Sequence, residues 1–265
     1  MLKPLALSCA LALGLAACAT TTSPTGRTQS VGAVSQQQLN QMGAQAFAEL
    51  KARKQQTSDS RQRAYVGCVV NAIVAQLPAD QRRMAWESAV FVDNSPNAFA
   101  LPGGKVGVYT GIFTVARNQD QLAGVIAHEI GHVIARHHDE RVTRQMQAQA
   151  GLGILGAIVG NRVPAGTGQL AGMATQALFL LPNNRQQELE ADVVGQQLMA
   201  QAGFDPRGAV SLWENMIAAG GQRAPEFLST HPDPAARIGQ MRQRAASLLP
   251  AYEQARAAGR RPSCG

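Results

Sequence analysis

The sequence predicts an α+β fold that is mostly helical, with one small β-sheet. Apolar residues recur at helical spacing in most segments after residue 36. Alternation of period two, which is typical of strands, is confined to residues 87–110, where turn residues separate three short runs. The roughly 230 residues that follow the N-terminal segment suit one domain with a substantial core.

The N-terminal residues have the pattern of a secretory signal. Lys3 precedes an apolar run that ends at Ala17 and is too short to span a bilayer as a permanent helix. The Leu-Ala-Ala-Cys at residues 15–18 resembles a bacterial lipobox, which implies removal of residues 1–17 and lipid attachment to Cys18. The alternative is ordinary signal cleavage, which leaves the Cys18 thiol free.

The residue after Cys18 bears on the destination of the protein. Ala19 stands there in place of aspartate, a pattern that resembles outer-membrane sorting in many Gram-negative bacteria. We therefore expect a protein anchored to the outer membrane through lipidated Cys18 and facing the periplasm. The polar residues 18–35 are predicted to be a flexible tether.

The first half of the domain is predicted to contain two helices and then the sheet. The helices cover residues 36–57 and 61–77, and Pro78 ends the second one. The strands follow at residues 87–93, 97–101 and 105–110, separated by Asn-Ser-Pro and Pro-Gly-Gly turns.

The second half is predicted to contain long helices. One covers residues 120–146, with Asn118 or Asp120 as its N-cap, and another covers 185–202 and ends at Gly203. Further helices open at Asp205-Pro206 and cover residues 233–249.

These elements give the expected division of the chain. The domain covers residues 36–250, and residues 251–265 form a C-terminal tail. Residues 151–181 are rich in Gly and Ala, and they form either a flexible or weakly helical flap near the active site or a packed core helix.

Composition excludes one class of partner. The net charge is +7, but aromatic residues make up only 5% and are not interleaved with the basic ones, so we expect no nucleic acid binding. The basic surface suits anionic lipid headgroups. Cys68 and Cys264 remain in an oxidising setting, where they form a disulfide, pair between chains, or leave Cys68 as a buried free thiol.

His128, Glu129 and His132 form the most informative pattern, H-E-x-x-H, inside an apolar stretch predicted to be helical. Residues four apart share one face of a helix, so the two imidazoles can bind one metal ion. Glu129 then lies close enough to act on a water at that metal, as in zinc metalloproteases. A chance pentapeptide on a solvated helix is the alternative.

A catalytic zinc needs a third protein ligand, and two candidates compete. His138 stands where the metzincin pattern has its third histidine, but Ala135 replaces the glycine that lets the chain leave the helix. We expect the helix to continue and to turn His138 away from the metal.

Glu188 is the second candidate. Glu188 and Asp192 share one face of a predicted helix, so one can bind zinc while the other accepts a hydrogen bond from a ligand imidazole. Glu190 points elsewhere and is expected to be solvated or paired. The alternative is a plain acidic helix face.

These motifs, in this order, resemble peptidase family M48. The match consists of H-E-x-x-H at residues 128–132, Glu188-x-Glu-Ala-Asp192, the strand segment 97–104, and Thr230-His231-Pro232 followed by Arg237. It covers about residues 60–245 and implies a gluzincin-like zinc peptidase domain, with the sheet beside the H-E-x-x-H helix. The chain has no long transmembrane segments and no tetratricopeptide array, so it resembles the short periplasmic lipoprotein type.

The resemblance and the residue pattern together imply one Zn²⁺ per chain, bound by His128, His132 and Glu188, with Asp192 behind a ligand imidazole. A water takes the fourth position and Glu129 is its general base, which makes the protein a metalloendopeptidase.

Three roles are open for His231. It stabilises the oxyanion, or it reaches the open zinc position and holds the enzyme latent, or it is structural beside Pro232. Arg237 either pairs with an acid or lies on the surface.

The strand at residues 97–101 is expected to lie at the sheet edge. An extended substrate could add there as a further strand, along Asn97, Ala98 and Phe99. This mode suits unfolded or misfolded envelope proteins. The alternative is a latent or non-catalytic lipid-anchored chaperone or assembly factor with occluded zinc, and a homo-oligomer is left open.

Overall fold

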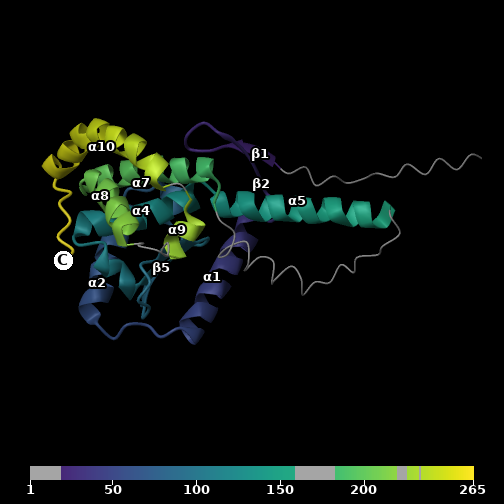
Figure 1. Ribbon diagram of the computed structural model, residues 1–265, viewed down its shortest axis with the longest axis horizontal. Coiled ribbons are helices and arrows are strands. Elements are labelled where there is room, and N and C mark those ends of the chain that lie inside the picture. Colours follow the sequence, from purple (N-terminus) through teal and green to yellow (C-terminus); the bar gives the residue numbers. More distant parts are fainter. Residues whose placement is uncertain (1–18, 159–182, 220–225, 233) are drawn as a thin grey trace, which may run out of the picture.

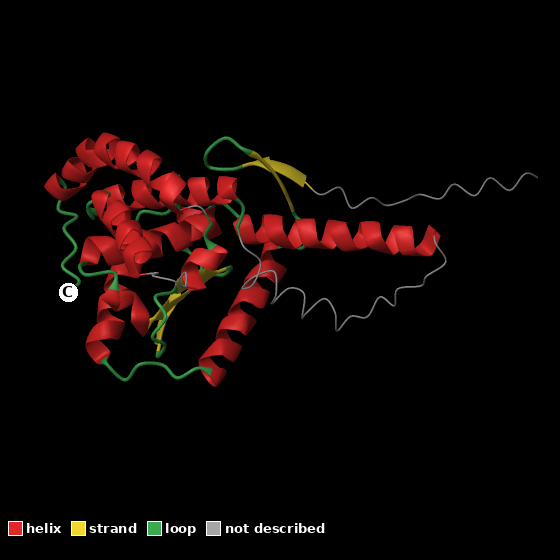
Figure 2. Ribbon diagram, viewed as in Figure 1, coloured by secondary structure: helices red, strands yellow, loops and turns green. Residues whose placement is uncertain are grey.

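Helices dominate the molecule, as the sequence predicts (Figure 2). The computed structural model describes residues 19–158, 183–219, 226–232 and 234–265 (Figure 1). The helices in chain order are α1 (Gln36–Arg53), α2 (Ser60–Val74), α3 (Ala79–Arg82), the 3₁₀ turn η1 (Thr110–Thr114), α4 (Gln119–Ile134), α5 (His137–Ile158), α7 (Arg185–Ala202), α8 (Arg207–Ala219), α9 (Glu226–Thr230) and α10 (Pro234–Ala257).

A three-stranded sheet lies beside α4, with the strands in the order β3-β5-β4. The strands are β3 (Glu87–Phe91), β4 (Ala98–Leu101) and β5 (Lys105–Tyr109). β5 runs parallel to β3 and antiparallel to β4. α1 is predicted to continue to residue 57 but ends at Arg53. The segment after it instead hydrogen-bonds, through Gln55 and Thr57, to the side of β3 that does not face β5. Among the described residues no strand pairs with the outer side of β4, so β4 is an edge strand.

The predicted flexible tether is wrong from Ala19 onward. β1 (Ala19–Thr22) and β2 (Thr28–Val31) form an antiparallel hairpin that lies over the start of α5 (Figure 1). Its buried groups are mostly polar, and Val31 is its buried apolar residue, so no alternation of apolar residues signals it in the sequence. The predicted signal segment 1–17 and the lipidated Cys18 lie outside the described residues.

Helix α4 lies in the centre of the main core, which also includes α2, α7, α8 and the sheet. Its contact with α7 is close because glycine stands on both sides. A Cβ on Gly131 would lie 2.9 Å from the Ala191 carbonyl oxygen, and one on Gly195 would lie 2.9 Å from the His128 backbone nitrogen. Both distances are too short for any larger residue, so these two glycines bring the H-E-x-x-H helix against the acidic helix.

The predicted single helix over residues 120–146 is wrong at its middle. α4 begins after its N-cap Asn118, as predicted, but ends at Ile134. The chain turns at Arg136, whose φ is 56°, and α5 starts at His137. Asp139 stabilises the turn by accepting from Arg136 at 2.5 Å and from the Gly32 backbone N–H at 2.9 Å. Such contacts offset the cost of a left-handed residue that is not glycine. α5 then projects away from the body of the protein (Figure 1).

Of the later helices, α7 has the predicted bounds, α8 and α10 differ from the prediction at their ends, and the short α9 is not predicted. α7 ends at Gly203, which has a φ of 85°. α10 continues past Pro250 to Ala257, so much of the predicted tail is helical. Of the predicted flap, residues 151–158 belong to α5, and residues 159–181 lie outside the described residues. No helix within the described residues is long and apolar enough to cross a membrane.

Cys68 and Cys264 form a disulfide across a sequence separation of 196 residues. The bridge ties the C-terminal segment to α2. The same segment is also held to the first residue of α4, because the Gln119 side chain accepts from the Cys264 backbone N–H at 3.0 Å and donates to the Pro262 carbonyl at 3.0 Å. Of the alternatives open at the sequence level, the structure has the intrachain bridge.

Candidate metal centre

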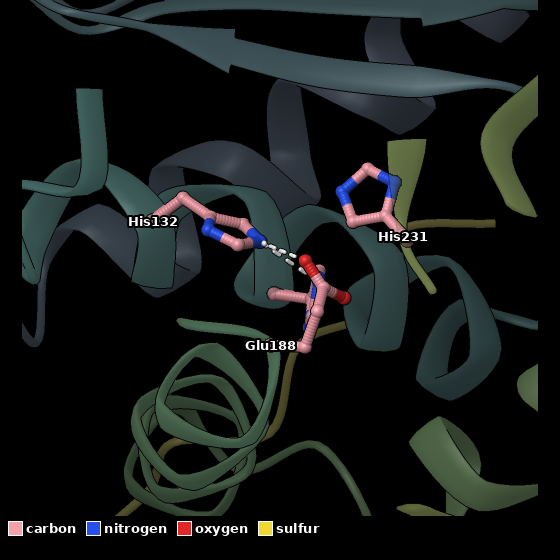
Figure 3. A group of neighbouring side chains, drawn as sticks. His132, Glu188 and His231 are labelled. Carbon is pink, nitrogen blue, oxygen red and sulfur yellow. Dashed lines mark hydrogen bonds and ion pairs between the residues drawn. The ribbon is translucent and has the colours of Figure 1, made fainter. Parts of the chain in front are cut away.

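Four buried side chains from three parts of the chain converge on one point. His128 and His132 come from α4, Glu188 from the first turn of α7, and His231 from the segment after α9. One ligand atom from each lies within 4.8 Å of the others. His132 and Glu188 point toward one another, and the His231 ring lies on the opposite side of the Glu188 carboxylate (Figure 3). This set could hold a metal ion.

The His128 imidazole is held from behind by Asp192. The His128 Nδ1–H donates to Asp192 Oδ1 at 3.0 Å, which turns Nε2 toward the cluster. Arg237 of α10 completes this support. Its Nη2 and Nε donate to the two oxygens of Asp192 at 2.7 Å each, and it also pairs with Glu188. Arg237 is only 1% exposed, so the reading of a surface arginine is wrong.

The His132 imidazole is held by His137, which belongs to no motif in the sequence. The two Nδ1 atoms lie 2.7 Å apart, and His137 Nε2 lies 3.1 Å from Glu190 Oε2. Glu190 is therefore buried and paired. Burial opposes ionisation, but hydrogen bonds from His137, Ser23 and Thr25 lower the pKa of Glu190 to about 2.

The turn between α4 and α5 creates this contact, because it returns His137 to the side of His132. His138 stays outside the cluster, as predicted, but for another reason: the helix does not continue. Its Nδ1 is buried without a hydrogen-bond partner among the described residues.

Glu129 faces the cluster together with His231. The His231 Nε2 lies 3.1 Å from Glu129 Oε1. On its other side, His231 Nδ1 lies 2.9 Å from the Phe227 carbonyl oxygen, and the two rings stack at 3.9 Å between centroids. The segment after α9 thus holds this imidazole with one nitrogen toward Glu129.

Arg141 and Asn183 form a polar pair on the His132 side of the cluster. Arg141 is buried and donates to Asn183 Oδ1, and Asn183 Nδ2 lies 3.3 Å from His132 Nε2. Burial is the main reason that the pKa of Arg141 falls to about 10, although Glu129 and Glu188 oppose the change. Neither residue carries a motif that would have indicated it in the sequence.

The chemistry of the donors fits a divalent cation. When both Nδ1 atoms donate, both Nε2 atoms carry lone pairs, yet His128 Nε2 and His132 Nε2 lie 3.1 Å apart. Glu188 Oε1 adds negative charge 3.3 Å from His132 Nε2 and accepts no hydrogen bond. Mutually repelling acceptors of this kind, buried at one point, are stabilised by a cation between them, and two imidazoles with one carboxylate are a common zinc set.

The pKa values of the two imidazoles differ in direction. Burial lowers the pKa of His132 well below its usual value. Burial also acts on His128, but in the absence of a cation its contacts with Asp192 and Glu188 outweigh burial and raise the pKa of His128 to about 9. His128 Nε2 then carries a proton toward Glu188, and a bound divalent cation would replace that proton. A neutral His132 is the form in which Nε2 is free to bind a metal.

The predicted substrate strand lies at the sheet edge, as expected. The Ala98 side chain is buried in the core, and the Phe99 ring packs against Phe47, Phe91 and Tyr109. Asn97 accepts from the Tyr109 backbone N–H at 2.9 Å. The Ala98 and Phe99 side chains and the Asn97 carbonyl are thus occupied, and the outer backbone edge of β4 is what the strand can offer a ligand.

Comparison with known proteins agrees with this geometry. Residues 60–245 match the profile described as peptidase family M48. Mitochondrial metalloendopeptidase OMA1 of Schizosaccharomyces pombe is 40% identical over 183 residues, which are 68% of this chain and 52% of that protein. The beta-barrel assembly-enhancing protease of Escherichia coli (strain K12) is 31% identical over 238 residues, which are 86% of this chain and 47% of that protein. The chain thus spans about half the length of these relatives.

Proposed function

The chain belongs to peptidase family M48, and from that premise we propose that it is a zinc endopeptidase whose metal is bound by His128, His132 and Glu188. The observation that carries the proposal is the meeting of α4 and α7, which brings two imidazoles and a buried carboxylate to one point. Three protein ligands leave one position for water, which is the usual arrangement of a catalytic rather than a structural zinc.

Glu129 is the catalytic base in this proposal. When bound, zinc lowers the pKa of a water and polarises the scissile carbonyl. Glu129 takes a proton from the attacking water and later delivers one to the leaving amine. Its Oε1 is buried and lies 3.1 Å from His231 Nε2, but this contact lacks the geometry of a hydrogen bond, so the oxygen has an acceptor position for that proton.

Asp192 and Arg237 keep His128 in its working orientation. The carboxylate fixes the proton on Nδ1, and the guanidinium keeps the carboxylate ionised and in place. Burial raises the pKa of Asp192, but Arg237 and His128 outweigh it and lower that pKa.

Substrates are proposed to bind as an added strand along the outer edge of β4. Of the three residues predicted to bind substrate, Asn97 and Phe99 pair with β5 through their backbone groups, and the backbone groups of Ala98 between them point to the outer edge. Main-chain hydrogen bonds to Ala98 would select extended segments rather than a particular sequence. Unfolded or misfolded proteins supply such segments, and we propose that envelope proteins in this state are the substrates. Placement at the periplasmic face of the outer membrane, through lipid on Cys18, is part of the same proposal.

The test measures metal content and cleavage of casein by the parent chain and by Glu129→Gln. One zinc per chain in both proteins, with cleavage by the parent alone, is the expected result. Glu129→Gln keeps the size of the side chain and removes the base. Cleavage by both proteins would exclude Glu129 as the base, and the absence of stoichiometric zinc in the parent would exclude the metal site.

A second candidate is a latent form of the same enzyme, favoured by the position of His231. A neutral His231 that donates from Nδ1 to the Phe227 carbonyl carries a lone pair on Nε2, which is the atom that faces the cluster. Such a ring could occupy the position of the water, whereas a protonated ring could stabilise the oxyanion. His231→Ala separates the two: casein cleavage rises if His231 blocks the metal and falls if it stabilises the oxyanion.

A further inference from the structure

The N-terminal hairpin is closed by its own turn and presents two side chains to α7. Within the turn, the Ser23 N–H donates to the Arg27 carbonyl at 2.8 Å, and the Arg27 N–H donates to Ser23 Oγ at 3.1 Å. Thr25 and Arg27 then reach Glu190. Thr25 Oγ1 donates to Glu190 Oε1 at 2.8 Å.

Arg27 joins the hairpin to two acidic residues at once. Its Nη1 and Nη2 donate to the two oxygens of Glu140 at 2.8 Å each. Its Nε and Nη2 donate to Glu190 Oε2 at 3.1 and 3.0 Å. The side chain of Glu190 is 2% exposed and that of Arg27 is 19% exposed, so the hairpin covers a carboxylate that would otherwise lack a cationic partner among these contacts.

The contacts continue from Glu190 to the metal-facing imidazole with a consistent placement of protons. His132 Nε2 faces the cluster, so its proton lies on Nδ1 and is donated to His137 Nδ1 at 2.7 Å. The His137 proton then lies on Nε2 and is donated to Glu190 Oε2 at 3.1 Å. Each of the two histidines donates to one acceptor, and the series ends at Arg27, whose guanidinium only donates.

We propose that the N-terminal hairpin is part of the metal centre, with Arg27 as a positioning residue that acts through Glu190 and His137 to orient His132. Arg27 fixes the Glu190 carboxylate, Glu190 fixes the tautomer and tilt of His137, and His137 fixes Nε2 of His132 toward the metal. The inference rests on the proposed zinc site. It means that the metal centre also requires the N-terminal hairpin, which precedes the residues 60–245 that match the family.

Arg27→Met tests the proposal against a purely structural role of the hairpin. The full chain is extracted in detergent, and zinc affinity is measured by competition with a chromophoric chelator. Loss of a direct partner of a ligand histidine weakens metal binding by about 10- to 100-fold, and Arg27 acts through two intervening residues, so we expect zinc binding about 10-fold weaker, at the lower end of that range. The visible absorption of the cobalt-substituted protein should also change, because the angle of His132 changes.

Glu140→Gln is the matched control. It weakens the ion pair that Arg27 makes with α5, but it leaves Glu190 and its contact with His137 in place. We expect zinc affinity within about threefold of the parent and an unchanged cobalt spectrum. Arg27→Lys should retain part of the affinity, because it keeps the charge but loses the fork that binds two carboxylates. Thr25→Val, which removes one hydrogen bond to Glu190, should weaken zinc binding less than Arg27→Met.

The outcomes separate this proposal from the proposed function. If the parent binds one zinc and Arg27→Met binds it equally well, or if Glu140→Gln weakens binding as much as Arg27→Met, the positioning role is wrong and the zinc site stands. If the parent binds no zinc, both proposals fail. Circular dichroism of each variant establishes that it is folded, and Thr25→Val decides the matter if Arg27→Met does not fold.

Discussion

His128 and His132 lie one turn apart on α4, yet the groups behind their Nδ1 atoms come from different parts of the chain. Asp192 contacts His128 directly, and Arg237 behind it is 1% exposed. We call these two residues the direct support. Behind His132 stand His137, Glu190 and, at the outer end, Arg27 with a 19% exposed side chain. We call these three the relayed support.

The two supports use the same chemistry at different depths. Each ends in an arginine on a carboxylate, and each fixes a proton on Nδ1 so that Nε2 is the atom that faces the cluster. The direct support lies wholly within the segment that matches the family, whereas the relayed support ends in the hairpin before it. A break in the direct support leaves charge deep in the core. A break at the outer end of the relayed support can be hydrated, so it should affect the metal more than the fold.

Arg237→Met should produce the largest effect, because it leaves Asp192 and Glu188 buried without their cation. Loss of one partner of a buried pair costs about 3–5 kcal/mol. The measurement is urea unfolding of the zinc-free protein, so that metal binding does not contribute. Arg242→Met is the matched control on the same helix, since Arg242 pairs with Glu214 in an exposed contact and should lose about 1 kcal/mol or less. Equal losses in the two variants would contradict the deep placement of the direct support.

His137→Gln should weaken zinc binding by about 10- to 100-fold, with a smaller loss of stability, because it interrupts the relayed support at its centre. His138→Gln is the control: the neighbouring histidine is also buried, but the structure places it outside the cluster. Chelator competition on the folded variants measures both affinities. Comparable loss in the two would mean that any polar change at the start of α5 disturbs the site, and that His137 has no particular role.

The metal ligands and Asp192 could be predicted from the sequence because their information is local, whereas the contact of Arg237 with Asp192 joins residues 45 apart and is open at the sequence level. H-E-x-x-H and the spacing of Glu188 and Asp192 each place two side chains on one helix face, and the structure has them there. Gly203 likewise marks the end of α7 through its own backbone conformation.

The relayed support could not be predicted because its residues are far apart in the sequence and because it depends on a helix end that has no usual sequence signal. Arg27 and Glu190 are 163 residues apart, and no pattern in either segment indicates the other. The turn at Arg136 lacks the glycine or proline that usually signals a helix end, and contacts from the hairpin to Asp139 help to hold it. Propensity favoured a continuous helix, and tertiary contacts overrode it.

Asp93→Asn should change the free energy of unfolding least. It measures what a partly exposed ion pair contributes to stability. Lys54 and Asp93 pair at 2.5 Å with side chains 26% and 27% exposed. Burial opposes ionisation, but Lys54 and Ser95 lower the pKa of Asp93 from 3.8 to about 2. Asn keeps the oxygen that accepts from the Ser95 N–H and replaces the oxygen that faces Lys54 with an amide nitrogen, so the variant removes the pair with Lys54 and keeps the turn.

Because the pKa of Asp93 is lower in the folded state, the pair stabilises the fold fully above pH 3.8, and this contribution is lost as the pH falls through about 2. Urea unfolding should therefore show a difference of about 0.2–1 kcal/mol between parent and variant at neutral pH that narrows on acidification. A difference near that of Arg237→Met would mean that burial does not distinguish this exposed pair from the direct support. A small difference in unfolding free energy would support burial as the reason that loss of Arg237 destabilises the fold more than loss of Arg27.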